Sequence, residues 1–328
     1  TLRSTDLELT IEIEILVSIE EEGSAAIPLK QLYEITNELQ ETRITITVDD
    51  RNKVKIETKT GSYDLMGKPK EEFPATPKTD EKKKINILGG IFKEIINSTL
   101  FAVSKDDLKP SLTGVLFRFK SNGITAVATD GHRLVKKTNE KDIIDNFIGD
   151  IVVPKKFLSY LSNHLSDENI IIAVDEKYIK ATIKKDTIIS RTINEVFPDF
   201  ESVIPKDNNK KLKTDKKTLL GAIKRVSIFS NKSTHQVAFN ISKEGVFITT
   251  EDPESSSRAK EEIIADYEGD EIKIGYNGEY LKDVVSHISG EDVIVSLNTP
   301  ISATLFSSEK EEEKTKKIML LMPVRLNN

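Results

Sequence analysis

The chain has 328 residues, 37% of them hydrophobic and 31% charged, which is typical of a folded protein of two or three domains rather than a disordered one. It contains no cysteine and only four histidines, which excludes a disulfide framework and a thiolate nucleophile and disfavours a metal site. The net charge of −6 argues against a protein that grips nucleic acid over its whole surface, although a basic face on an acidic body stays open. No apolar run approaches the roughly 20 residues of a membrane helix, so we expect a cytoplasmic protein without a membrane partner.

Amphipathic helices alternate with short strands along the chain. Helical patterns occur at 27–35, 86–103, 153–165, 215–229 and 276–284. In the segment 86–103, one apolar stripe contains Leu88, Ile91, Phe92, Ile95 and Thr99. Alternating patterns predict strands at 43–50, 53–59, 114–120, 123–129, 178–184, 236–242, 245–250 and 292–297. The predicted fold class is α+β, with antiparallel sheet and two helices on one side of it. No glycine-rich phosphate loop follows a strand, so we expect no nucleotide or other cofactor.

Several landmarks recur at one spacing. Thr129 of "ATDGHRL" lies 124 residues after Thr5 of "STDLEL", and Thr250 of "ITTEDPES" lies 121 residues further on. Phe73 of "EEFPATPK" and Phe197 of "EVFPDFES" are also 124 residues apart. A period of this length is far above the roughly 20–50 residues of a solenoid repeat and equals a domain. The sequence therefore predicts three tandem copies of one domain.

The boundaries of the copies fall in charged segments rich in proline and other breakers. Copy one occupies 1–81, copy two 82–206 and copy three 207–328. The first copy is short. Only four residues precede Thr5, whereas its counterpart in the second copy, Thr129, lies 44 residues after Ile85, near the start of that copy. We therefore expect roughly 40 residues to be missing from the start of the first domain.

The faces of the helices that point away from the predicted core share small, polar and basic side chains. An ordinary solvated face explains each helix by itself, and acidic residues dilute the basic trend. The recurrence in five helices favours a surface that meets a phosphate backbone without reading its sequence. The cations on these faces are Lys30, Lys93, Lys156, Lys217, Lys224, Arg225 and Lys282.

The segment "ATDGHRL" raises the question of catalysis. Asp130 and His132 could act as an acid and a base, but they stand two residues apart on a turn. The third copy has no histidine there, and no nucleophile or metal set accompanies the pair. We therefore predict a protein that is not an enzyme, in which Asp130 and Gly131 form the turn.

Three motifs together resemble one known family. The segments "VATDGHRL" (127–134), "FPDFESVIPK" (197–206) and "LLMPVRL" (320–326), within three tandem domains, are similar to the bacterial DNA polymerase III beta subunit, the beta sliding clamp. The resemblance covers the whole chain. It implies a DNA-clamp fold in which two subunits form a head-to-tail homodimeric ring, with the helices around double-stranded DNA and the strands outside.

The resemblance also implies the partners and the mode of action. The ring would slide on DNA without reading its sequence and tether the replicative DNA polymerase for processive synthesis. The clamp loader and other repair proteins with a clamp-binding motif would dock in a peptide cleft between domains two and three. The residues implied for this cleft are Leu112, Thr129, Gly131, His132, Arg133, Leu134, Pro198, Val203, Ser302, Leu320, Met322, Pro323, Val324 and Arg325.

The resemblance places the dimer interface on two segments, one with Tyr63 and Leu65 and the other with Ile263 and Ile264. Whether His132 contacts the docked peptide or supports its neighbour is left open by the sequence. The alternative function is a non-enzymatic interaction scaffold of three domains that does not encircle DNA. No cofactor and no metal enter either function.

Overall fold

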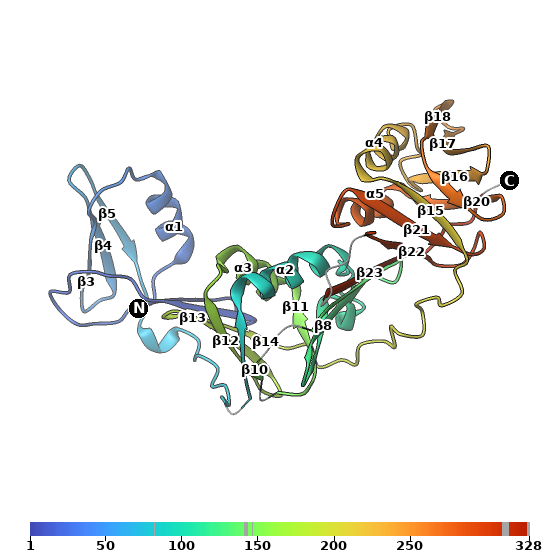
Figure 1. Ribbon diagram of the computed structural model, residues 1–328. Coiled ribbons are helices and arrows are strands. Elements are labelled where there is room, and N and C mark those ends of the chain that lie inside the picture. Colours follow the sequence, from blue (N-terminus) through green and yellow to red (C-terminus); the bar gives the residue numbers. More distant parts are fainter. Residues whose placement is uncertain (82, 141–143, 146, 310–314, 327–328) are drawn as a thin grey trace.

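The computed structural model describes residues 1–81, 83–140, 144–145, 147–309 and 315–326. Figure 1 shows three bodies in chain order along an arc, with the helices gathered on its concave side. The helices in the described residues are α1 (Leu29–Glu38), α2 (Gly89–Thr99), α3 (Lys155–His164), α4 (Lys216–Ser227) and α5 (Gly278–Ser286). Short 3-10 turns occur at η1 (Lys70–Glu72), η2 (Leu100–Ala102) and η3 (Pro110–Leu112).

Two large sheets run through the arc. The first has the order β1 (Leu2–Thr5), β2 (Leu9–Ile13), β14 (Asp186–Arg191), β13 (Tyr178–Ile183), β12 (Asn169–Val174), β6 (Lys84–Leu88) and β10 (Ile144–Asp145). The second has the order β11 (Gly149–Pro154), β7 (Gly114–Lys120), β8 (Gly123–Thr129), β9 (Arg133–Asn139), β23 (Thr315–Leu321), β22 (Thr304–Ser307), β21 (Asp292–Leu297), β15 (Lys210–Asp215) and β19 (Asp266–Glu268).

Two smaller sheets complete the first and third domains. One consists of β3 (Thr45–Val48), β4 (Lys53–Glu57) and β5 (Ser62–Met66). The other consists of β18 (Ser257–Ile263), β17 (Gly245–Asp252), β16 (Gln236–Ser242) and β20 (Ile272–Asn277). Neighbouring strands pair antiparallel throughout the described residues. The predicted α+β class with antiparallel sheet is confirmed.

Strand pairing continues across both domain boundaries. In the first joint, β2 of the first domain pairs with β14 of the second over four residues, from Leu9 opposite Ser190 to Glu12 opposite Thr187. In the second joint, β9 pairs with β23 over seven residues. Because each joint joins two sheet edges, neither edge is left open to pair with another chain.

Helices α2, α3, α4 and α5 bury apolar faces, largely as their apolar spacing predicts. Helix α3 buries Phe157, Leu158 and Leu161 in the main core, which it shares with the apolar faces of α2, α4 and α5. The predicted stripe on α2 is wrong at its first residue, because Leu88 stands at the helix N-cap and is 46% exposed. Helix α1 buries none of its residues. None of the helices in the described residues is long and apolar enough to cross a membrane.

Candidate functional site

The turn between β8 and β9 is built by its own side chains. One carboxylate oxygen of Asp130 accepts hydrogen bonds from the backbone N–H groups of His132 and Arg133, at 2.9 and 3.0 Å. Gly131 has a φ of +90°, a left-handed conformation that glycine adopts without strain. Thr129 closes the turn, because its hydroxyl donates to the carbonyl oxygen of Arg133 at 2.6 Å. The prediction that Asp130 and Gly131 form the turn is confirmed.

The side chain of Arg133 connects the second and third domains. Its guanidinium, whose side chain is 9% exposed, donates to Asp130 at 3.1 Å and to the carbonyl oxygen of Phe101 at 2.8 Å, both in the second domain. Across the boundary it donates to Asp283 on α5 at 2.5 Å. It also lies 4.8 Å from the ring centroid of Tyr280, in cation–π contact. Arg133 is therefore a buried link between domains.

His132 is exposed, and its ring stacks on the same Tyr280 ring, with the centroids 5.5 Å apart. Burial, and then the charge of Asp130, raises the pKa of the Tyr280 hydroxyl. The backbone oxygen of His132 accepts a hydrogen bond from the N–H of Met322 at 2.8 Å. Because Asp130 bonds backbone N–H groups and Arg133, its carboxylate does not serve the imidazole as a catalytic partner would.

The residues implied for the peptide cleft divide by burial. Leu134 and Leu320 lie directly opposite each other on β9 and β23 and are both 3% exposed. They pack with Phe200 in a small second core. Buried with them are Leu112, Thr129 and Arg133. The residues that remain available at the surface are Gly131, His132, Pro198, Val203, Met322 and Arg325, with Ser302, Pro323 and Val324 half-buried.

Beneath the second joint lie two cross-strand lysines. Lys137 and Lys317 face each other on β9 and β23. Lys137 is 5% exposed and donates to Glu94 at 2.7 Å, and Lys317 donates to the carbonyl oxygen of His287 at 2.6 Å. Burial, and then the charge of Lys137, lowers the pKa of Lys317 to about 8. Lys317 at this joint therefore loses its positive charge at moderately alkaline pH.

Most of the cations predicted to face DNA are held by partners within the chain. Lys93 donates to the carbonyl oxygen of Leu165 at 3.2 Å. Ion pairs connect Lys30 with Glu34, Lys156 with Asp6, Arg225 with Glu261, and Lys282 with Glu279. For Lys217 and Lys224 on α4, both exposed, the described part of the chain offers no ion-pair partner. Among the seven predicted cations, these two are therefore the ones whose side chains form no ion pair or hydrogen bond within the described chain.

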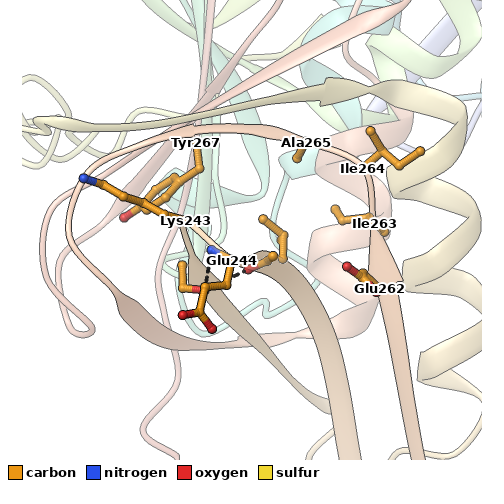
Figure 2. A pocket seen from close by; sticks show the side chains of 10 residues that line it. Lys243, Glu244, Glu262, Ile263, Ile264, Ala265 and Tyr267 are labelled. Carbon is orange, nitrogen blue, oxygen red and sulfur yellow. Dashed lines mark hydrogen bonds between the residues drawn. The ribbon is translucent and has the colours of Figure 1, made fainter.

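The segments predicted to form a dimer interface lie on strands at sheet edges. Within the described residues, β5 pairs only with β4, and β18 pairs only with β17. At the end of β18, Ile263 is buried, whereas Ile264 is 92% exposed. Figure 2 shows these two side chains at a hollow of about 440 Å³, with Lys243 of the β16–β17 turn on its other side. On β5, Tyr63 and Leu65 are half-buried.

Comparisons with known proteins identify the fold. Models for the N-terminal, central and C-terminal domains of the DNA polymerase III beta subunit match residues 1–77, 86–199 and 201–325. The chain belongs to the DNA polymerase III beta subunit family. Sliding clamps of this family are processivity factors and not enzymes, so the predictions of the family and of a non-enzymatic role are confirmed.

Relatives and solved structures agree with this family. The chain is 29% identical to the beta sliding clamp of Pseudomonas putida over 99% of this chain and 89% of the relative, and 29% identical to that of Bacillus subtilis over 94% and 82%. The structure superposes on a DNA polymerase III beta subunit from Pseudomonas aeruginosa with a TM-score of 0.90 at 27% identity, over 99% of this chain and 88% of the other. A DnaN sliding clamp from Bartonella birtlesii bound to griselimycin gives 0.92 at 25% identity, with the same coverage.

Sequence reasoning missed the partners that fix the second joint of this beta sliding clamp. Asp283 is one of the acidic residues on the helix faces predicted to be basic, and it binds Arg133 from 150 residues away. Phe101 was read as a helix residue, yet its ring stacks on His287 across the same boundary at 3.9 Å. A signal was present in the helical spacing of Tyr280 and Asp283, which puts an aromatic ring and a carboxylate on one face.

Proposed function

We propose that the chain works as the ring-forming DNA sliding clamp of a replicative polymerase. Two subunits would close a head-to-tail homodimeric ring around duplex DNA. The observation that carries this proposal is the continuation of the sheets across both domain boundaries, with the helices on the concave side (Figure 1). Such a frame curves around a central space and leaves the sheets outside. We assign the three domains to 1–81, 82–206 and 207–328.

Edge strands would close the ring. Strand β5 of one subunit would pair with strand β18 of the other, because both present an unpaired side within the described residues. Ile264, which is 92% exposed, would lose contact with water there, and Tyr63 and Leu65 would pack beside it. Ile263 is already buried and would hold the end of β18 in place.

DNA would meet the exposed cations of the concave helices. Lys217 and Lys224 are the strongest candidates because both are exposed and neither forms an ion pair within the described residues, although the charge of Asp215 acts on Lys217. Lys30, Lys93, Lys156, Arg225 and Lys282 would contribute less, since each is already bonded within the chain. A weak and uneven positive charge suits a ring that must slide along DNA. The closed ring, rather than high affinity for the phosphates, would keep it on the duplex.

Partner peptides would dock beside the second joint. The exposed apolar groups of Val203 and Met322 are suited to hold the apolar anchors of a short motif, with His132 and Arg325 at its polar ends. The replicative polymerase, the clamp loader and repair proteins with such motifs are the expected occupants. Arg133, Leu134 and Leu320 would act from beneath by fixing the geometry of the cleft.

Retention on circular DNA tests the proposal. The protein is loaded by a clamp loader onto nicked plasmid, separated from free protein at high salt, and followed after the plasmid is cut. We expect retention on the circle and rapid loss from the linear form. Lys217→Glu with Lys224→Glu should reduce loading, while the matched pair Lys59→Glu with Lys120→Glu, at hairpin turns, should not. Equal retention on both forms, or a monomer at micromolar concentration, would favour the three-domain scaffold.

A further inference from the structure

A groove lies on the central domain beside the predicted cleft. A hollow of about 690 Å³ is bounded by β7, β11 and the segment 192–201. A second hollow of about 390 Å³ shares Val174 and Glu176 with the first and continues it as far as Tyr178. In Figure 1 the chain that follows β14 runs along the convex side of the arc, opposite the helices. The groove and the concave side can therefore be occupied together.

The floor of the groove is apolar and its rim is acidic. The buried floor includes Leu116, Val152 and Phe200, and Val196 at the lip is 90% exposed. The larger hollow is lined by two cations, Lys83 and Arg118, and the smaller hollow adds Lys78 and Lys177. The carboxylates that line the larger hollow are Asp150, Asp175, Glu176, Glu195, Asp199 and Glu201, and the smaller hollow adds Asp80. An apolar floor inside a negative rim is complementary to an apolar anchor flanked by positive charge.

Part of this negative charge is free to meet a ligand, although Lys136 pairs with Glu201 at 2.6 Å. Arg118 is held by Asp150, with its nitrogen atoms 2.8 to 3.1 Å from the carboxylate, and its charge also acts on Glu201 and Asp199. For Glu176 and Glu195, both exposed, the part of the chain that the structure describes gives no ion-pair partner. The rim therefore keeps a net negative potential beside the apolar floor.

The edge of β11 favours an extended ligand. The carbonyl oxygen of Val152 accepts a hydrogen bond from the N–H of Ile193, so the backbone polar groups of Val152 point out of the sheet edge. Because these groups alternate along an antiparallel strand, those of Asp150 point to the same side. Ile193 pairs with Val152 in an isolated antiparallel bridge, and within the described residues no such bridge is formed by Asp150. The backbone groups of Asp150 on this edge are therefore unpaired by a strand. A peptide in extended conformation can take the next position along this edge.

We propose that this groove is a second docking site, which binds an extended segment of a partner protein with apolar residues flanked by lysine or arginine. It adjoins the predicted cleft, because its floor residues Leu116, Val152 and Phe200 pack in the same small core as Leu134 and Leu320. Val152 on β11 and Leu134 on β9 are separated by three strand spacings, roughly 14 Å at about 4.8 Å each. The two sites share Pro198, which lies on the segment 192–201 that bounds the groove.

Methyl NMR of the intact protein tests the site. The probe is a synthetic octapeptide with two leucines flanked on both sides by lysines, and the matched probe carries glutamates in place of the lysines. We expect the basic peptide to shift the δ1 methyl signals of Ile151 and Ile193, which line the groove, and to leave that of Ile301, beside the predicted cleft, unchanged. The acidic peptide should shift none of them.

Charge reversal separates the site from general attraction. Glu176→Lys with Glu195→Lys should weaken binding of the basic peptide by about tenfold. Glu271→Lys with Glu291→Lys changes the net charge equally at exposed positions elsewhere and should leave the affinity unchanged. An equal loss in both variants, shifts confined to Ile301, or no shift of Ile151 and Ile193 would each overturn the proposal.

Discussion

The turn at residues 5–9 and the turn at residues 129–133 are copies of one structure, and each feeds a strand into an inter-domain joint. In both, a threonine hydroxyl donates to the carbonyl oxygen four residues later, at 3.0 Å for Thr5 and 2.6 Å for Thr129. In both, the following aspartate accepts two backbone N–H groups through one oxygen. The third position is left-handed in each, with a φ of 76° at Leu7 and 90° at Gly131.

The copies differ in how they are tied to the next domain. At the end of the turn the first has Leu9, which is buried in the main core, and the second has Arg133. Asp6 forms its ion pair with Lys156 of the neighbouring domain, both well exposed. Arg133 instead donates from a buried guanidinium to Asp283, whose carboxylate is half exposed. The same turn thus connects the first two domains through one exposed ion pair and the last two through the several bonds of Arg133. The joint with more bonds lies beside the proposed cleft.

Replacing Arg133 with leucine, the residue of the other copy, should have the largest effect. The change leaves Asp130 buried without its cation and removes the bond to Asp283, so we expect the free energy of unfolding to fall by about 3 kcal/mol. Denaturant unfolding measures this, and hydrogen exchange of β9 and β23 amides locates it. Arg225→Leu, at an exposed ion pair, should leave stability nearly unchanged. Equal losses in both variants would mean that the second joint is no tighter than a surface pair.

Replacing Lys317, the buried lysine at the second joint, should have the next largest effect on stability. Burial lowers the pKa of Lys317 from 10.5 to about 8, so between these values the unfolded chain binds the proton and the folded chain does not. Stability should therefore rise as the pH increases from about 8 to 10.5. Lys317→Met should raise the free energy of unfolding at pH 7 by about 1–2 kcal/mol and remove this rise.

The neighbouring Lys316 is the matched control, because it stands exposed on the same strand. Lys316→Met should keep the dependence on pH of the unmodified protein. Thermal unfolding between pH 7 and 10.5 compares the two variants. A rise that persists in Lys317→Met would assign the titration to another group.

Local patterns predicted much of the fold. The landmarks Thr5 and Thr129 proved to be the same turn at atomic level, and the apolar stripe of α3 is buried as predicted. Strand β12 was missed because its burial does not alternate cleanly: Ala173 and Val174 are both buried. Strands β9 and β23 were missed because they are defined by pairing across a domain boundary, which no local period encodes.

The sequence predicted which residues of the site lie close together, but not how their side chains are oriented. The motifs placed His132, Arg133 and Met322 together, and the structure joins them through the bond between His132 and the N–H of Met322. Their orientation was not predictable, because alternation along β9 sends Arg133 toward α5 and Leu134 into the second core. The bond between Arg133 and Asp283 depends on how two domains pack, which a single sequence does not contain.

A substitution at the left-handed position should give a smaller effect. Gly131→Ala places a Cβ where no atom lies within 4 Å, so the cost comes only from the φ of 90° and should be about 1 kcal/mol. Leu7 shows that a side chain is tolerated in the other copy. Gly23→Ala is the control, since its Cβ also meets nothing within 4 Å and its φ is not left-handed. If both changes proved neutral, the turn would not depend on the glycine.

The ion pair of the first joint should give the smallest effect, with a dependence on pH of the same sign as that of Lys317 but in the acidic range. The hydrogen bond from Lys156 lowers the pKa of Asp6 from 3.8 to about 2. Its contribution is therefore present above pH 4 and lost as the pH falls through 2. Because the side chains of Asp6 and Lys156 are 41% and 60% exposed, Asp6→Asn should cost less than about 1 kcal/mol at pH 7. Added salt should reduce that cost further, whereas the loss in Arg133→Leu should persist, because solvent screens the exposed pair and not the buried one.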